Sequence, residues 1–229
     1  MATRAKKSPA PDSASPAAPG RLTIPAPRFQ VATFLIEGTS PYVQNRFSAK
    51  ALAEIRATQE GGSQARKGKK REAKDFKQAY EGAMHRAPDG WIGIPAPAFR
   101  AAMISACRIV GFFKTMARLS VFVEEDGLDA VDGTPLVRIT VGEPTYVEHH
   151  VRNATGVVDL RPRPMWAPGW RAEVRVRWDL DQFSIEDTTN LLTRAGLQVG
   201  VGEGRPDSRN SAGMGWGLFR VVSVREGER

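Results

Sequence analysis

The sequence predicts an α+β fold in which strands and helices share one core. The segment Trp170–Trp178 alternates apolar and polar residues without interruption, which is typical of an antiparallel strand with one buried face. Phe99, Met103, Cys107 and Val110 recur at helical spacing and predict a helix with one buried stripe. The 229 residues are 41% hydrophobic, which is enough for one large domain or two small ones.

Residues 1–27 are rich in Pro, Ala and Ser and carry several basic side chains. Such a composition cannot build a core, so we expect a disordered, mildly cationic tail. A single domain is expected over residues 28–229. It opens with Phe29–Ile36, which is rich enough in apolar and β-branched residues for a mostly buried strand, and Gly38–Pro41 ends that strand.

A helical insertion is predicted at about residues 39–90. Ser48 is a good N-cap for a helix that reaches about Gln59, and a second helix is predicted over Glu72–Gly82. Between them lies a glycine-hinged basic loop, Gly61–Arg71, whose cations can neutralise phosphates or can simply be solvated. These cations are Arg66, Lys67, Lys69, Lys70 and Arg71.

A third helix is predicted to begin near Pro97 and to end at Gly111, because proline suits a first helical turn and glycine suits a helix end. Three short apolar and β-branched segments follow and predict extra β-hairpins, with a turn-rich stretch after the first of them. These segments are Leu119–Val123, Val137–Val141 and Thr145–Val151.

A fourth helix is predicted to start at Ser184, which forms a capping-box pattern with Asp187, and to end at Gly196. Leu218–Val224 is predicted to be the last strand. The first strand, the third helix and the strand after it make one β-α-β unit. The strand Trp170–Trp178, the fourth helix and the last strand make a second unit. Together they predict a ferredoxin-like (RRM-like) β-α-β-β-α-β core.

The run Gly196–Gly217 is rich in glycine and lies between a predicted helix and a predicted strand. A dinucleotide-binding loop has the reverse order, strand and then helix, so we expect neither that site nor any other cofactor. The backbone at Gly200 and Gly202, with Arg205 and Arg209, can instead follow a phosphodiester backbone. The alternative is a long connection that uses glycine only to turn.

Arginines on the polar face of the alternating strand predict a second basic surface, formed by Arg171, Arg175 and Arg177. Arg161 and Arg163 lie among prolines and extend this surface from an edge segment. The alternative is that these arginines pair within the sheet with acids such as Glu173 and Asp179.

Three aromatic residues beside Pro or Gly, namely Tyr42, Trp166 and Trp216, are candidates for stacking on bases, and core packing is the alternative.

The glycine-rich run also carries a resemblance. Ala195-Gly196, Val199–Gly202 and Gly213–Phe219 are similar to the C-terminal glycine-rich signature of the RAMP superfamily, the ferredoxin-like CRISPR-associated proteins. They also resemble phage-encoded proteins with the same signature. The resemblance implies a non-catalytic protomer that binds single-stranded RNA or DNA and assembles side by side, with the insertion lying over the strand. Some relatives cleave RNA with an aspartate just after the first strand. Gly38–Asn45 contains no aspartate, so no catalytic residue is implied here.

The charge and composition indicate what kind of partner and which cellular compartment to expect. A net charge of +8 favours polyanionic partners, although it also serves solubility alone. The single cysteine, the lack of a long apolar stretch and the lack of a signal peptide predict a cytoplasmic protein, in a bacterial host cell if it is phage-encoded.

The three histidines, His85, His149 and His150, lack clustered ligands in the sequence, so no metal is predicted. Two other classes stay open: a phage or mobile-element assembly protein that binds no nucleic acid, and a nuclease of unrecognised type.

Overall fold

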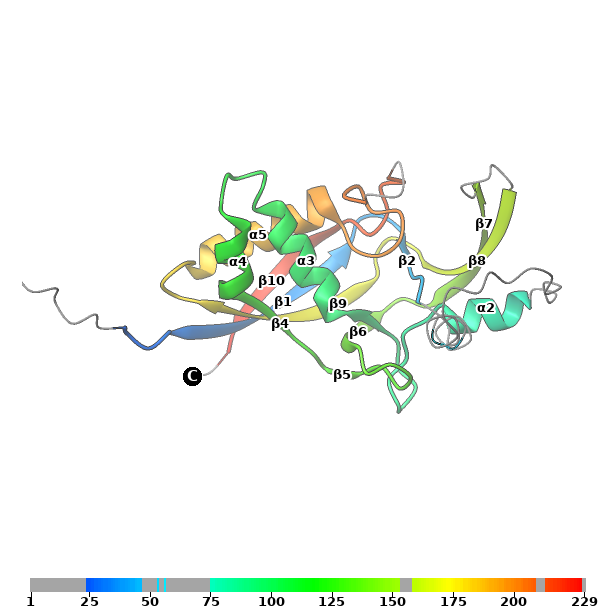
Figure 1. Cartoon of the computed structure of the whole chain (residues 1–229), viewed down its shortest axis with the longest axis horizontal. Helices are drawn as coiled ribbons and strands as arrows, with labels where there is room; N and C mark the ends of the chain where they lie inside the picture. The colour runs from blue at the N-terminus through cyan, green and yellow to red at the C-terminus, as the bar shows by residue number, and fades with distance from the viewer. Residues whose placement is uncertain are drawn as a thin grey trace, which may run out of the picture.

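The computed structural model describes residues 24–46, 53, 56, 75–152, 158–208 and 213–227. It is a mixed α+β protein, as predicted, with antiparallel sheets and several helices (Figure 1). The elements are β1 (Phe29–Gly38), β2 (Tyr42–Val43), α2 (Phe76–Gly82), β3 (Gly93–Pro95), α3 (Ala96–Ala106), α4 (Lys114–Ser120), β4 (Val121–Glu124), β5 (Gly127–Leu128), β6 (Pro135–Val141), β7 (Pro144–Arg152), β8 (Val158–Trp166), β9 (Arg171–Asp179), α5 (Ile185–Arg194), the π-helix η1 (Ala195–Val199) and β10 (Phe219–Glu226).

The main sheet of the described residues has seven strands in the order β10-β1-β9-β6-β3, with β4 also pairing with β9 and β5 with β6. Every pairing is antiparallel. Phe34 on β1 lies between Val224 on β10 and Val174 on β9, so alternate residues of the three strands share one face. The strand predicted over Trp170–Trp178 is confirmed as β9, one residue further along.

Helices α3, α4 and α5 lie on one face of this sheet (Figure 1). The apolar set of β9 (Ala172, Val174, Val176 and Trp178) is fully buried under them, together with Phe99 of α3. The helix predicted at Ser184 is confirmed with its capping box, because the Ser184 hydroxyl accepts from the Asp187 amide and the Asp187 carboxylate accepts from the Ser184 amide. Burial of alternate strand residues thus follows the predicted pattern.

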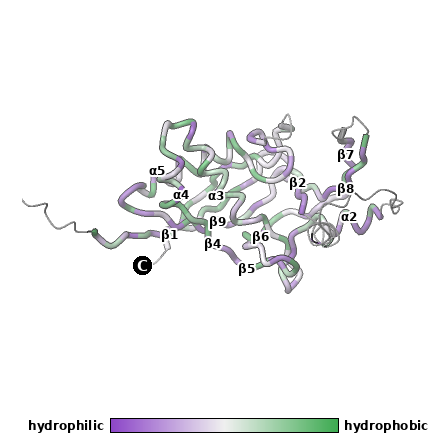
Figure 2. Tube along the Cα trace, in the orientation of Figure 1, coloured by the Kyte–Doolittle hydropathy of each residue, from purple (hydrophilic) through white to green (hydrophobic). Residues whose placement is uncertain are grey.

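A second, three-stranded sheet has the order β2-β8-β7 and lies with α2 at one end of the long axis (Figure 1). The helix α2 is half-buried or exposed throughout and largely hydrophilic (Figure 2). It contacts the hairpin through Tyr80, whose ring centroid lies 5.2 Å from that of Tyr146 on β7. Sequence reasoning treated β8 as an edge segment; it pairs with β7 along its whole length but with β2 only at Met165 and Trp166.

The strand expected to start at Leu119 starts two residues later, because Leu119 and Ser120 belong to α4. Ala117 and Ser120, three residues apart, are buried while Leu119 between them is 72% exposed. That burial has a helical period, so the apolar appearance of Leu119–Val123 was misleading.

Gly196 does not end the fourth helix, contrary to the prediction. The chain continues as the π-helix η1 and leaves it at Gly200, whose φ of 74° is a positive value that favours glycine. At Gly196 a β-carbon would lie 2.6 Å from the ring of Phe219, so the glycine is needed for close packing against β10 and not for a helix end.

Several predicted features lie outside the described residues, including most of the tail, the basic loop and Arg209. Within the helix predicted from Ser48, Ala53 and Arg56 are described and are helical. None of the helices in the described part of the chain is both long and apolar enough to cross a membrane.

We predict that Gly196→Ala lowers the free energy of unfolding by about 1–3 kcal/mol, since the added methyl group overlaps Phe219 and the backbone must shift. Urea unfolding followed by circular dichroism measures this. Leu197→Ala in the same turn, where the side chain is 53% exposed, is the control and should stay within about 0.5 kcal/mol of the wild type. Equal effects of the two changes would contradict the packing role of Gly196.

Candidate nucleic-acid interface

The glycine-rich run folds back onto the residues that follow β1. The Glu203 amide donates to the Val43 carbonyl at 2.9 Å, and the Gly217 amide donates to the Pro41 carbonyl at 2.7 Å. The Val201 amide in turn donates to Gly217 at 3.0 Å. The two ends of the run therefore hold each other and the short strand β2, and these three amides, with others of the run, donate within the protein.

The glycines permit this close approach. At Gly202, with a φ of 82°, a β-carbon would lie 2.5 Å from the Val43 carbonyl oxygen. At Gly217, with a φ of 70°, it would overlap the backbone of Val201. Internal packing thus accounts for much of the glycine content, which is closer to the alternative interpretation than to a run of amides free for a ligand.

A partly buried ion pair joins this run to the β7–β8 hairpin. Arg163 of β8 is 8% exposed, and its Nε donates to the Glu203 carboxylate at 2.5 Å. Its Nη1 also donates to the Pro162 carbonyl at 3.0 Å. Arg161, two residues earlier, pairs with Asp159 at 3.2 Å on the more exposed part of the hairpin. Arg163 is therefore a positioning residue for the glycine-rich run.

Trp216 lies against the same hairpin and is half-buried. Its ring centroid is 4.8 Å from that of His149 on β7, with the rings tilted by 39°, and its other side covers Gly204. Burial lowers the pKa of His149 below its ordinary value, partly offset by nearby Glu203. We call Arg163, Glu203, His149 and Trp216 the hairpin–loop junction.

The other two stacking candidates are core residues. Tyr42 and Trp166 are each 1% exposed, and their ring centroids lie 5.3 Å apart. Tyr42 also lies 5.5 Å from Trp170. Burial raises the pKa of the Tyr42 phenol. The core interpretation is confirmed for both, so they offer no surface to a base.

The arginines of β9 lie on the sheet face that the described helices leave open, and each has an acidic partner. Arg171 pairs with Glu37 at 2.5 Å, and Arg220 of β10 pairs with the same carboxylate at 2.6 Å. The two guanidinium groups hold the pKa of Glu37 below its usual range, Arg220 most strongly. Arg175 pairs with Asp126 at 3.3 Å.

Arg177 completes the set on β9. It lies 3.8 Å from Glu124 and stacks over the rings of Phe29 and Phe122, at 5.0 Å from each centroid. Pairing within the sheet was the alternative interpretation, with Glu173 and Asp179 as partners. The observed partners come from β1, β4 and the turn after β4, and Glu173 instead pairs with Arg225.

The described residues are electrically balanced. Lys and Arg are as numerous among them as Asp and Glu, so the formal charge of +8 arises wholly outside them. That excess belongs to residues 1–23, to the insertion between Arg46 and Asp75, and to Arg209. A polyanion would therefore be attracted chiefly to these segments.

Arg205 is half-buried, and its Nη1 donates to the Gly202 carbonyl at 3.0 Å, which stabilises the loop. Two residues further on, the Asp207 carboxylate accepts from the Ser105 hydroxyl and from Arg108 on the α3 side. The hydrogen bond from Ser105 and the charge of Arg108 lower the pKa of Asp207. The run is thus anchored at β2, at β8 and at α3.

A cluster that sequence reasoning missed surrounds His85, whose Nδ1 lies 2.9 Å from the Asp129 carboxylate, with Asp132 close by. Such a set could ligate a metal. However, Arg46 Nε lies 3.3 Å from Asp129 and 3.4 Å from Asp132, so a guanidinium already contacts both carboxylates and offsets one of their two negative charges. The cluster therefore fits a structural role, tying the start of the insertion to the loop after β5.

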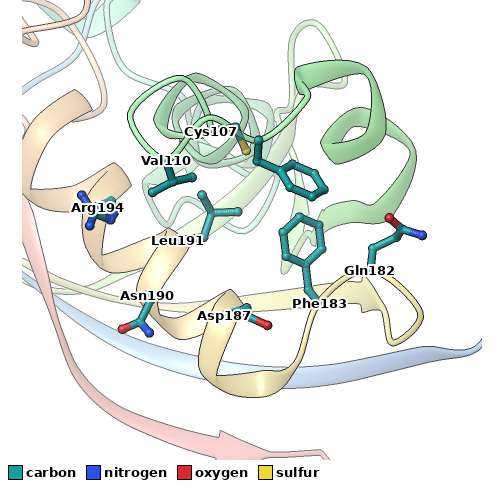
Figure 3. A pocket seen from close by; sticks show the side chains of 9 residues that line it. Cys107, Val110, Gln182, Phe183, Asp187, Asn190, Leu191 and Arg194 are labelled. Carbon is teal, nitrogen blue, oxygen red and sulfur yellow. The ribbon is translucent and has the colours of Figure 1, made fainter.

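A pocket of about 300 Å³, lined by both apolar and polar side chains, lies between the end of α3 and α5 (Figure 3). Its floor contains Cys107, Phe183 and Leu191, and burial raises the pKa of the Cys107 thiol. Asp187 on its rim is engaged in the capping box. The cysteine is therefore a core residue, as predicted, and not an activated nucleophile.

No protein-family model matches the chain, and no curated protein matches it significantly. Among solved structures, the chain is similar to one chain of the cryo-EM structure of type III-B Cmr-beta bound to cognate target RNA, with a TM-score of 0.47 and 12% sequence identity. The match covers 86% of this chain and 60% of the Cmr-beta chain.

We predict that Arg163→Met lowers the free energy of unfolding by about 1–3 kcal/mol, because Glu203 loses its partner in a partly buried place. Arg161→Met on the same strand is the control; its pair is more exposed, so the loss should stay below about 1 kcal/mol. Thermal unfolding measures both. Equal losses would show that the hairpin–loop junction is not held by the Arg163 pair.

We also predict that stability falls as the pH decreases from about 7.5 to about 5.5. Burial lowers the pKa of His85 in the folded protein below its ordinary value near 6.5, so the unfolded chain takes up the proton first. Neutral His85 therefore stabilises the folded protein at a pH above about 6.5, and this stabilisation is lost as the pH falls below that value. Urea unfolding across this range should show a smaller pH dependence for His85→Gln. His150→Gln, at an exposed position, should behave like the wild type, and an unchanged dependence in His85→Gln would contradict the assignment.

Proposed function

We propose that the chain is a non-catalytic protein that binds single-stranded RNA or DNA and assembles side by side along it. The observation that supports this most is the division of charge: the described fold is balanced, whereas the insertion carries Arg66, Lys67, Lys69, Lys70 and Arg71 without a nearby excess of acid. A segment of this kind binds the phosphate backbone without needing base contacts. The basic loop, rather than the arginine face of the sheet, is then the main contact.

The fold places the ends of this insertion close to the glycine-rich run. Arg46, at its start, donates its amide to the Ala83 carbonyl at 3.0 Å, so the chain enters the insertion beside the end of α2 and returns at Asp75, the N-cap of the same helix. Val43, three residues before Arg46, accepts from Glu203 of the run. The strands β7 and β8, which carry His149 and Arg163 of the hairpin–loop junction, lie with α2 at the same end of the molecule (Figure 1). We infer a binding surface that combines the basic loop, the run with Arg205 and Arg209, and Trp216.

The strand order supports a more specific proposal for the fold. The elements β1, α3, β4, β9, α5 and β10 form two β-α-β units, and their strands lie in the antiparallel order β10-β1-β9-β4. This is the order of a ferredoxin-like core, on which a RAMP-type assignment depends. The small sheet β2-β8-β7 and α2 are then additions to that core.

A second candidate is an assembly protein that binds no nucleic acid. Exposed apolar side chains of the α3–α4 connection and of α4 favour contacts between copies: Phe113 is 75% exposed and Leu119 is 72% exposed. Size-exclusion chromatography before and after nuclease treatment separates the two. Oligomers that persist unchanged and never carry nucleic acid would favour this candidate.

We predict that replacing the five cations of the basic loop with Gln weakens binding of a labelled single-stranded oligonucleotide and flattens its salt dependence by roughly 0.7 for each lost phosphate contact. Filter binding across a salt series, with RNA and DNA in parallel, measures this. The control is Arg225→Gln with Glu173→Gln, which removes one sheet ion pair at constant net charge and should bind normally. Absence of wild-type binding even at low salt would overturn the proposal, and strand cleavage with Mg²⁺ would replace it with a nuclease.

A further inference from the structure

A second cavity, also of about 300 Å³, lies between α3 and α4 and is lined by basic side chains. Arg100 comes from α3, and Lys114 and Arg118 come from α4. Lys114 and Arg118 are four residues apart, so they share one face of the helix. The remaining lining is uncharged and includes Pro97, Ile104 and Ser105. A cavity with three cations on an apolar floor is suited to an anion attached to a larger, partly apolar group.

The three cations differ in how they are held. Arg100 Nε donates to the Val121 carbonyl at 2.8 Å and Nη2 to the Arg118 carbonyl at 2.5 Å, which fixes the end of α4 against α3. Lys114 and Arg118 form no ion pair with any residue that the structure describes. They contrast with the arginines of β9, whose charges are balanced by carboxylates. The cavity therefore combines Arg100, which is held by two backbone carbonyls, with Lys114 and Arg118, whose charges have no described carboxylate partner.

The cavity also borders the glycine-rich run. Ser105, part of its lining, donates to Asp207 of that run, and Arg108 balances the Asp207 carboxylate. A strand that follows the run would therefore reach Lys114 and Arg118 without crossing an uncompensated acid. We propose that the α3–α4 cavity binds a phosphate group of the same single-stranded nucleic acid. The identity of the anion rests on the proposed function. The presence of the basic cavity is observed in the structure and is independent of that function.

The test compares single-charge variants of the full chain. Lys114→Gln and Arg118→Gln should each weaken binding of a labelled single-stranded oligonucleotide several-fold and reduce the salt slope by roughly 0.7, and Arg118→Lys should restore the slope because it keeps the charge. Arg138→Gln is the matched control. It removes one exposed charge that lies over the Trp91 ring and does not line the cavity, and it should bind like the wild type. Thermal unfolding confirms that each variant folds.

The outcomes separate this inference from the proposed function. If the wild type binds but Lys114→Gln, Arg118→Gln and Arg138→Gln bind alike, the cavity is not part of the path, although the proposed function stands. If the wild type binds no oligonucleotide, the proposed function fails. Binding of polyglutamate that is lost in Lys114→Gln would then assign the cavity to an acidic peptide and overturn the nucleic-acid assignment. The inference is supported if Lys114→Gln and Arg118→Gln weaken oligonucleotide binding and polyglutamate does not compete with the oligonucleotide.

Discussion

The packing of four buried aromatic rings connects the parts of this protein. Tyr42 of β2 contacts Trp166 of β8 and Trp170 before β9, and Trp170 lies 6.3 Å from Phe219 of β10. The cluster therefore spans both sheets. It also contacts α3, because the ring centroids of Phe219 and Phe99 lie 5.7 Å apart. Aromatic side chains bury large areas, so this contact stabilises the position of the small sheet relative to the main one.

The arginines of β9 and β10 are paired with acids, whereas the excess positive charge of the chain lies elsewhere. Within the fold, arginines are matched by carboxylates from neighbouring strands, as with Arg171 and Arg220 on Glu37. Such exposed pairs contribute little stability, but they cancel the field that an arginine-rich sheet face would otherwise produce. The excess positive charge of the chain belongs to segments that the structure does not describe, while Lys114 and Arg118 of the α3–α4 cavity are among the described cations without a carboxylate partner.

Much of the fold was predictable because its signals are local. Ser184 and Asp187 are three residues apart, so their capping box depends on the sequence alone, and the alternation in β9 reports one buried face directly. The candidate site was less predictable. Arg163 was expected on a binding surface but is buried against Glu203. The two residues are 40 positions apart, and no local sequence pattern predicts such a contact. His85 and Asp129, which are 44 positions apart, escaped notice for the same reason.

The sequence by itself determined the α+β class, the buried Cys107 and the placement of glycines between a helix and a strand, since each depends on residue type and short-range order. The tertiary structure decided which charges are free. Whether Arg175 or Lys114 can meet a phosphate depends on strand order and register, which bring Asp126 to the first and leave the second without a described partner. It also decided what the glycines serve. At Gly217 the neighbour that excludes a side chain is Val201, which reaches it only because both ends of the run fold onto β2.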